Sequence, residues 1–375
     1  MKEGWTYKQL GEVATFARGL TYSKKDEVES SKNIVLRSNN IDLLSGKLDF
    51  SELKYLDENF EIPADKRVKQ GSLFICMSNG SKAHLGKVAY IDKDYNYAFG
   101  GFMGQITPTN DVDGLYLHYA LSSPLYKDYI KSLSEGANIN NLKFKDLSGF
   151  VIGYPSLDEQ ISIVSRLDAA FAKIDALKAN AERQLAEARA LFNRALTEEM
   201  TPKEGWEERP FEGCINKIPK QKQVKSKDYK TYGSFPIVSQ EKDLISGYWD
   251  DESYLYKHDK PIIIFGDHTK EIKYIDFDFV VGADGTQLLS PKDDINTRFF
   301  YFALLNTHIR TLGYARHFKL LKEKMFFIPP INVQHSIVAR LNALWANVRQ
   351  LEEVQRKTLA ECDALKQAML REVFE

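Results

Sequence analysis

Four polar loops of this 375-residue chain carry residue types that can read DNA bases. They span residues 78–87, 136–143, 266–270 and 313–319, and each places Asn, Ser, Thr, His, Lys or Arg beside glycine. Asn can pair with adenine, Arg and Lys can pair with guanine, and Ser, Thr and backbone amides can hold phosphates. Each loop alone also fits an ordinary solvated turn, but the recurrence of such loops in both halves of the chain favours nucleic-acid recognition.

Two further segments offer the same chemistry. Residues 37–40 read Arg-Ser-Asn-Asn, and residues 217–230 contain a run of lysines suited to phosphate contact, although a mobile basic surface loop would read the same way. The candidate DNA-binding residues are Arg37, Asn39, Asn40, Ser78, Asn79, Ser81, Lys82, His84, Lys87, Asn138, Asn140, Asn141, Lys143, Lys222, Lys225, Asp267, His268, Thr269, Lys270, Arg316, His317 and Lys319.

The apparent catalytic motifs are weak. Residues 80–87 resemble a phosphate-binding loop, but the spacing is one residue too long, Val88 replaces the magnesium-binding Ser or Thr, and the following residues read as a strand. Glu271 and Lys273 after Asp259 or Asp267 fit a short metal-dependent nuclease pattern that arises often by chance. No glycine-rich methyl-donor loop and no catalytic triad is evident. We therefore expect no catalytic residue, no metal and no cofactor in this chain.

Composition indicates an ordinary globular protein of two or three domains. Hydrophobic residues make up 43% and charged residues 27%, and the net charge of −1 means that an anionic partner must be met by local basic patches. No apolar run approaches the roughly 18 residues of a membrane span, and the first residues lack the apolar core of a secretory signal. The three cysteines are far apart in sequence, so neither a disulfide framework nor a zinc site is indicated. We expect a cytoplasmic protein without a membrane partner.

The two halves of the chain share a predicted order of strands, turns and helices. In the first half, strands at 71–77 and 87–91 flank a polar turn, and strands at 260–265 and 271–275 do the same in the second half. Both halves continue with a glycine-containing strand end, a short helix, a polar loop and a final strand. These later elements are expected at 98–101, 114–133, 136–143 and 149–154, and at 280–283, 296–311, 313–319 and 325–328.

A sequence repeat organises the whole chain. Residues 155–167 reappear without a gap as residues 329–341, and each copy opens with proline and continues as one long helix. Apolar residues recur in each helix at alternating three- and four-residue steps, which is typical of a coiled-coil seam. The first seam is Val164, Leu167, Phe171, Ile174, Leu177, Ala181, Leu185, Ala188, Phe192 and Ala195. The second is Ile337, Leu341, Leu344, Val348, Leu351, Leu365 and Met369, with Gln355, Thr358 and Cys362 between.

The repeat predicts an α+β protein in which two similar domains are joined by two long helices. The boundaries are 1–154 and 201–328 for the domains, and 155–200 and 329–375 for the helices; Gly4-Trp5 and Gly205-Trp206 mark the domain starts. We expect the helices to form an antiparallel intramolecular coiled coil of roughly 40 residues each, about 60 Å long, in a pseudo-twofold molecule. The alternative is that each helix only caps its own domain.

The whole chain resembles the specificity subunit of type I restriction-modification systems. The resemblance rests on the helix starts 157–164 and 334–338, the Gly-Trp domain starts, the strand-turn pattern 71–101 and the stretch 313–319. One departure is Asn332-Val333 in the second helix start, where the first has Asp158-Glu159. That change puts a helix-capping role there in doubt.

The resemblance implies two target-recognition domains, each reading half of a split double-stranded DNA sequence, with the helices as a ruler. It also implies that modification subunits dock against the helices, supply S-adenosylmethionine chemistry and flip adenines, and that restriction subunits join the complex. Two other hypotheses stay open at this point, a coiled-coil adaptor that binds only proteins and a metal-dependent nuclease.

Overall fold

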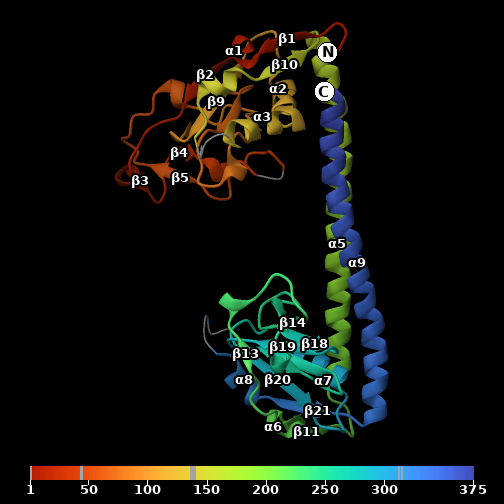
Figure 1. Ribbon diagram of the computed structural model, residues 1–375. Coiled ribbons are helices and arrows are strands. Elements are labelled where there is room, and N and C mark those ends of the chain that lie inside the picture. Colours follow the sequence, from red (N-terminus) through yellow and green to blue (C-terminus); the bar gives the residue numbers. More distant parts are fainter. Residues whose placement is uncertain (1, 43–44, 136–140, 311–312, 314–315) are drawn as a thin grey trace. The chain divides into compact units, whose positions relative to one another are not determined.

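The computed structural model describes residues 2–42, 45–135, 141–310, 313 and 316–375. It contains two compact units. Unit 1 comprises Met1–Asn180 and Lys357–Glu375, and unit 2 comprises Ala181–Arg356 (Figure 1).

Unit 1 is built from short strands and helices that lead into a long helix. Its strands are β1 (Thr6–Gln9), β2 (Ala14–Arg18), β3 (Glu27–Val28), β4 (Asn33–Leu36), β5 (Lys54–Leu56), β6 (Leu73–Cys76), β7 (Val88–Tyr90), β8 (Ala98–Phe99), β9 (Met103–Pro108) and β10 (Val151–Tyr154). Its helices are α1 (Leu10–Val13), α2 (Gly114–Ala120), α3 (Pro124–Glu135), α4 (Phe144–Ser148) and the first part of α5 (Leu157–Met200).

Unit 2 repeats this order. Its strands are β11 (Glu207–Pro210), β12 (Ile215–Asn216), β13 (Gln223–Val224), β14 (Phe235–Val238), β15 (Gly247–Trp249), β16 (Leu255–Tyr256), β17 (Ile262–Gly266), β18 (Ile272–Ile275), β19 (Phe279–Gly282), β20 (Thr286–Pro291) and β21 (Met325–Ile328). Its helices are α6 (Phe211–Cys214), α7 (Thr297–Leu305), α8 (Phe318–Lys322) and the first part of α9 (Ile331–Phe374).

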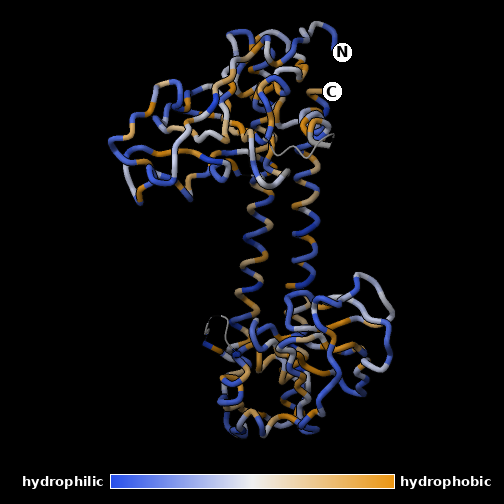
Figure 2. Tube along the Cα trace, turned by 60° about the vertical axis from the view of Figure 1, so that its left-hand side comes forward, coloured by the Kyte–Doolittle hydropathy of each residue, from blue (hydrophilic) through white to orange (hydrophobic). Residues whose placement is uncertain are grey.

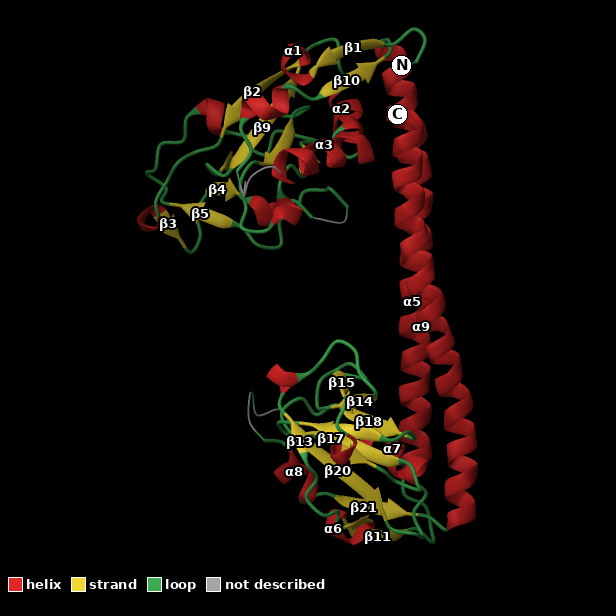
Figure 3. Cartoon of the chain, in the orientation of Figure 1, coloured by secondary structure: helices red, strands yellow, loops and turns green. Residues whose placement is uncertain are grey.

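The sheets of the two units have matching topologies. Figure 3 shows the strands of each unit together with the short helices beside them. An antiparallel four-stranded sheet has the order β2-β9-β6-β7 in unit 1 and β12-β20-β17-β18 in unit 2. A second sheet contains a parallel pair, β4 with β8 in unit 1 and β14 with β19 in unit 2. The strands β1 and β10, and likewise β11 and β21, pair antiparallel. The predicted duplication of an α+β fold is therefore confirmed.

The central strand of each antiparallel sheet is buried on both faces, which explains its unbroken apolar sequence. Because side chains alternate along a strand, Leu73 and Ile75 of β6 face the core that contains α2 and α3, while Phe74 and Cys76 face a second core beside β8. In β17, Ile263 and Phe265 contribute to one core, and the alternating isoleucines contribute to another.

The repeated Gly-Trp pair closes the same corner in both units. Gly4 and Gly205 have φ values of 77° and 85°, which favour glycine. Each turn brings the next residue onto a helix, so Trp5 lies 6.3 Å from Tyr116 of α2 and Trp206 lies 6.3 Å from Phe299 of α7, between ring centroids.

The two long helices pair antiparallel within each unit. In unit 1, Lys178 of α5 forms an ion pair with Asp363 of α9 at 2.8 Å, and Asp175 pairs with Lys366, so residue numbers rise along one helix as they fall along the other. In unit 2, Arg189 pairs with Glu352 at 2.7 Å, and the Glu199 carboxylate accepts hydrogen bonds from Nε and Nη2 of Arg340. Figure 2 shows both helices as mainly hydrophilic, with hydrophobic residues recurring along them.

The predicted seam is correct for most of its length and wrong at two leucines. Val164, Leu167, Ile174, Leu185, Phe192, Ile337, Leu341, Val348 and Cys362 are buried as predicted. Leu177 and Leu365, however, are 58% and 51% exposed. Lys178 and Lys366 lie against the partner helix instead, with side chains 22% and 19% exposed, because a lysine stem can cover apolar surface while its ammonium group reaches a carboxylate.

A buried glutamine anchors the first turns of each long helix to the segment just before α2 or α7; this contact is called the glutamine lock. The Gln160 side chain accepts from Asp113 N (2.8 Å) and donates to the carbonyls of Asp111 and Pro155 (both 2.9 Å). Gln334 makes the same three bonds, accepting from Asn296 N (2.7 Å) and donating to the carbonyls of Asp294 (3.0 Å) and Pro329 (2.8 Å). This lock accounts for the glutamine that both copies of the repeat share.

Replacing Gln160 with leucine is expected to lower the free energy of unfolding by about 3 kcal/mol, because three buried backbone groups lose their partner. Urea unfolding of the whole chain would measure the change. Gln184→Leu, at an exposed position of α5, is the control and should leave the midpoint unchanged. Equal midpoints for both variants would show that the lock does not hold the helix.

Candidate nucleic-acid interface

In unit 1, the end of β6 turns sharply against two other loops. The amides of Met77 and Ser78 both donate to the carbonyl of Phe102, at 3.0 and 3.1 Å, and Leu142 N donates to the carbonyl of Met77 at 2.7 Å. Ser78 also forms an isolated bridge with Asn141. These bonds hold together three loops that are far apart in sequence.

Unit 2 builds the corresponding turn in the same way. The amide of Asp267 donates to the carbonyl of Gly285 at 2.8 Å, and His317 N donates to the carbonyl of Asp267 at 2.7 Å. The Asp267 carboxylate additionally accepts from Phe318 N at 2.8 Å. Gly285 is the structural counterpart of Phe102. Phe102 directly precedes β9, which pairs with β6, and Gly285 directly precedes β20, which pairs with β17 in the same register.

A basic hollow of about 740 Å³ opens beside the turn of unit 1. Its lining includes Arg18, Tyr22, Lys24, Arg37, Asn79 and Phe102. Three cations against the single carboxylate of Glu27 give this surface a positive balance, and Phe102, 72% exposed, adds an aromatic ring. Cationic and polar side chains beside an aromatic ring match what a protein needs to hold DNA phosphates and contact base edges.

Three of the predicted DNA-binding residues line this hollow, namely Arg37, Ser78 and Asn79. Both polar atoms of the Asn79 side-chain amide are hydrogen-bonded, which fixes its orientation. Its Nδ2 donates to Ser38 Oγ at 3.0 Å, and its Oδ1 accepts from Ser81 N at 2.9 Å. The sequence thus identified part of one surface, although from two separate segments.

Three other predicted residues are buried and support loops. Asn40, 1% exposed, accepts from Arg37 N (2.8 Å) and donates to the carbonyls of Asp49 and Glu52 (both 2.8 Å). Asp267 and His317 are buried and bond to each other through the Asp267 carbonyl. Their side chains hold the loops in place, and they do not present themselves at the surface.

Lys87 and His84 lie apart from the basic hollow. Lys87 Nζ donates to the carbonyl of Ile41 at 2.6 Å, and burial lowers its pKa. Burial, and then the charge of Lys87, lower the pKa of His84. Lys87 lines a second and larger hollow of unit 1.

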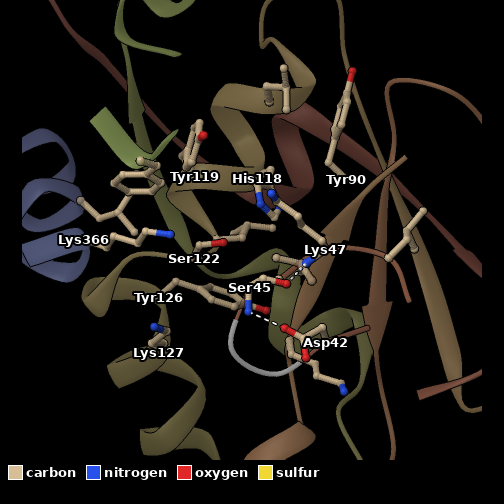
Figure 4. A pocket seen from close by; sticks show the side chains of 18 of the residues that line it. Asp42, Ser45, Lys47, Tyr90, His118, Tyr119, Ser122, Tyr126, Lys127 and Lys366 are labelled. Atoms are coloured by element: carbon tan, nitrogen blue, oxygen red, sulfur yellow. Dashed lines mark hydrogen bonds between the residues drawn. The ribbon is translucent and has the colours of Figure 1, made fainter. Parts of the chain in front are cut away.

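The second hollow, of about 1090 Å³, lies between the domain part of unit 1 and its long helices (Figure 4). His118 and Tyr119 of α2, Lys127 of α3 and Lys366 of α9 surround it, and the Tyr119 hydroxyl donates to Asp168 of α5. Burial lowers the pKa of His118 to about 4, so the ring is neutral at pH 7. Its lining mixes lysines with Asp42, Asp92, Asp168 and Asp175, which does not favour a polyanion.

In unit 2, several of the predicted residues remain at the surface and have separate hydrogen-bond partners. Arg316 is 79% exposed and its Nε lies 3.9 Å from Asp267 Oδ2. Thr269 Oγ1 donates to the carbonyl of Gln240 at 2.7 Å, and the His268 amide donates to Gln240 Oε1 at 3.0 Å. Lys222 Nζ donates to Ser253 Oγ at 3.0 Å and lies 5.1 Å from the Tyr254 ring centroid.

The other predicted positions that the structure describes lie mostly at the surface. Asn39, Ser81, Asn141, Lys143, Lys225 and Lys319 are exposed, and Lys270 is partly exposed with a φ of 63°. Asn138 and Asn140 lie outside the described residues, as does the side chain of Lys82.

The sequence did not single out Arg18, Lys24 or Phe102. Arg18 and Phe102 lie next to Gly19 and Gly101, and the backbones of Gly19 and Gly100 meet so closely that a Cβ on Gly19 would lie 2.1 Å from the carbonyl oxygen of Gly100. Glycines bordering a cationic and an aromatic residue were the available signal. That signal could be used only once the two segments were known to touch.

The suspected nuclease pattern has a structural role instead. Lys273 is 6% exposed, burial lowers its pKa, and its Nζ donates to the carbonyls of Ser239 (2.8 Å) and Asp243. Among the residues that the structure describes, no group of three or more His, Cys, Asp or Glu side chains is arranged to hold a metal ion. The Glu271 and Lys273 pattern therefore gains no support from the geometry.

Within the described residues, none of the helices has the length and the apolar character needed to span a membrane.

Comparison with known proteins agrees with this geometry. The family model of the type I restriction modification DNA specificity domain matches residues 2–187 and 203–361. The specificity subunit of the type I restriction enzyme StySPI of Salmonella potsdam is 25% identical over 423 residues, which cover 100% of this chain and 89% of that protein. The EcoKI specificity subunit of Escherichia coli K12 is 33% identical over 186 residues, covering 49% of this chain and 39% of that protein.

Solved structures share the fold. A structure from work on complex assembly and conformational transition of the type I R-M system has a TM-score of 0.75 at 18% identity, covering 99% of this chain and 97% of that one. The HsdS subunit of Thermoanaerobacter tengcongensis has a TM-score of 0.52 at 17% identity, covering 100% of this chain and 97% of that one.

Proposed function

This chain belongs to the family of type I restriction-modification DNA specificity subunits, and on that basis we propose that each of its units reads one half of a split DNA target. The chain acts as the sequence-specificity subunit of a type I restriction-modification system. In our proposal it performs no chemistry itself and directs modification subunits to their site.

The duplicated turn carries the proposal. The Met77 amide donates to the carbonyl of Phe102, and the Asp267 amide donates to the carbonyl of Gly285. Both units therefore present a loop at the same end of their corresponding central strands, β6 and β17. The residues at the surface of the two turns differ: unit 1 has Arg37, which is exposed, and Asn79, which is partly exposed, whereas unit 2 has the exposed Thr269 and Arg316. A shared scaffold with different surface residues suits two reading heads for two different half-sites.

The long helices offer a surface for protein partners. Leu177 and Leu365 are exposed in unit 1, and Leu191 and Val354 are exposed in unit 2. We propose that modification subunits cover these side chains and that restriction subunits then join the resulting complex. Because the same helices continue from one reading unit into the other, the proposed target has an unread spacer of fixed length.

Binding-site selection from random duplexes tests this function. The chain would be assembled with its neighbouring modification subunit, and the bound duplexes would be sequenced. The expected result is a bipartite motif with a fixed gap and salt-sensitive binding. Replacing residues 201–328 with the equivalent segment of another specificity subunit should change one half of the motif and leave the other unchanged.

Two results would contradict the proposal. An assembled complex that enriches no motif would show that the loops do not read bases, and would favour a protein-only adaptor. A replacement of residues 201–328 that alters both halves would show that the units do not read independently.

A further inference from the structure

Phe102 is an exposed aromatic residue in a position where its ring contributes little to the stability of the fold. Its side chain is 72% exposed, whereas burying a phenylalanine stabilises a fold by about 1.5–3 kcal/mol. A single exposed apolar residue is ordinary on a protein surface, so the inference depends on what surrounds this one.

The surroundings of Phe102 are those of the proposed reading surface. Its side chain lines the basic hollow together with Arg18, Arg37 and Asn79. Its carbonyl accepts the amides of Met77 and Ser78, so the backbone that carries the ring also carries the turn to which Asn79 belongs. The backbone that carries the ring is therefore held in a fixed position relative to the turn.

The equivalent position of unit 2 has no side chain. Gly285 accepts the Asp267 amide as Phe102 accepts that of Met77, but its φ is 79°, and a Cβ there would lie 2.8 Å from Gln240 Oε1 and 2.9 Å from His268. The shared scaffold thus accommodates a ring in unit 1 and excludes one in unit 2. A feature that differs between the two heads while their scaffold is the same suits a determinant of specificity.

The chemistry of duplex DNA suggests what the ring meets. In the major groove, the C5-methyl group of thymine is the one apolar feature by which base pairs differ, and phenylalanine is among the side chains that contact it. We propose that Phe102 makes apolar contact with a thymine methyl group in the half-site read by unit 1, an inference that depends on the DNA-reading function proposed above. The neighbouring Arg37 and Asn79 then contact the polar edges of adjacent bases.

Replacing thymine with uracil tests the contact directly, because uracil lacks the methyl group and keeps the same base pairing. With the wild-type chain assembled with its modification subunit, uracil at one thymine of the unit 1 half-site should weaken binding about fourfold, as expected for removal of one methyl group from an apolar contact. In a Phe102→Ala complex, the same replacement should have no effect.

Phe102→Leu keeps an apolar side chain and should retain most of the sensitivity to uracil. Leu125→Ala removes an exposed apolar side chain of α3 outside the hollow and should behave as wild type. Because uracil scanning of the wild-type complex needs no variant, the inference remains testable even if Phe102→Ala folds poorly.

Three results would overturn the inference. The first is a wild-type complex that tolerates uracil at every thymine, and the second is a selected half-site without thymine on either strand. The third is a Phe102→Ala complex that binds cognate and unrelated duplexes with equal losses. In each case a bipartite motif would still be selected, so the proposed function would stand; selection of no motif would remove both.

Discussion

Placing aspartate at both Leu177 and Leu365 is expected to weaken binding of the modification subunits by at least about 100-fold, while the chain itself stays folded. The two leucines are 58% and 51% exposed, so a carboxylate at either position remains hydrated in the isolated chain. In the proposed complex, where modification subunits cover these two positions, the same carboxylates would lose their hydration. That loss is unfavourable by several kcal/mol.

The geometry of unit 1 places these leucines at one level of the helix pair. The ion pairs of Lys178 with Asp363 and of Asp175 with Lys366 fix the register of α5 against α9 around them. The measurement is titration of the modification subunit into wild-type and variant chains, with thermal unfolding of each chain alone.

Two comparison variants separate docking from folding. Val151→Asp adds a charge at a half-exposed position of β10, outside the helices, and should leave assembly intact. Val348→Asp adds a charge at a buried seam position of unit 2, 3% exposed, and should lower thermal stability. If the Leu177→Asp, Leu365→Asp chain assembled with wild-type affinity, the modification subunits would have to dock elsewhere.

The seam shows how far periodicity alone can be taken. Alternating three- and four-residue steps identified both helices as a pair, because the apolar stripe follows from helical geometry. The antiparallel direction was predicted from the pseudo-twofold relation of the two repeats. The steps could not decide between Leu177 and Lys178, since a lysine stem fills a seam as well as a leucine when an acid lies opposite. Asp363 supplies that acid from a distant part of the sequence, so the choice depended on the register of the partner helix.

The repeat itself identified Gln160 and Gln334 without explaining them. Their role depends on three backbone groups that only the fold brings together, at the start of the long helix and just before α2 or α7. A polar residue that recurs in two copies of a repeat indicates a shared bond, but the sequence does not show the partners.

The candidate interface was predicted least completely. Residue type pointed to Arg37 and Asn79 as surface readers, and equally to Asn40 and His317, which are buried. A polar side chain that bonds to the backbone of its loop cannot be distinguished in sequence from one that points into the solvent. Arg18 and Phe102 joined the surface through contacts between strand ends, which local patterns do not encode.

Replacing Arg37 with alanine is expected to reduce affinity for the selected motif by about 10- to 100-fold and to relax base preference at one position of the unit 1 half-site. The backbone of Arg37 is pre-positioned, because its amide donates to Asn40 Oδ1 at 2.8 Å and Asn40 is itself anchored to Asp49 and Glu52. The guanidinium is exposed and lines the basic hollow beside Asn79. A fixed backbone with a free guanidinium is the arrangement that bidentate guanine recognition requires.

Salt dependence and the lysine variant distinguish reading a base from holding a phosphate. Arg37→Lys keeps the charge and loses the planar fork, so the base preference should still relax. Lys24→Ala, in the same hollow, should weaken binding to all sequences and lower the slope of log affinity against log salt by about one. Lys93→Ala, exposed and outside the hollow, should change neither. If Arg37→Ala weakened binding uniformly across sequences with a reduced salt slope, Arg37 would be a phosphate contact, and base recognition in unit 1 would have to come from Asn79 and the Phe102 ring.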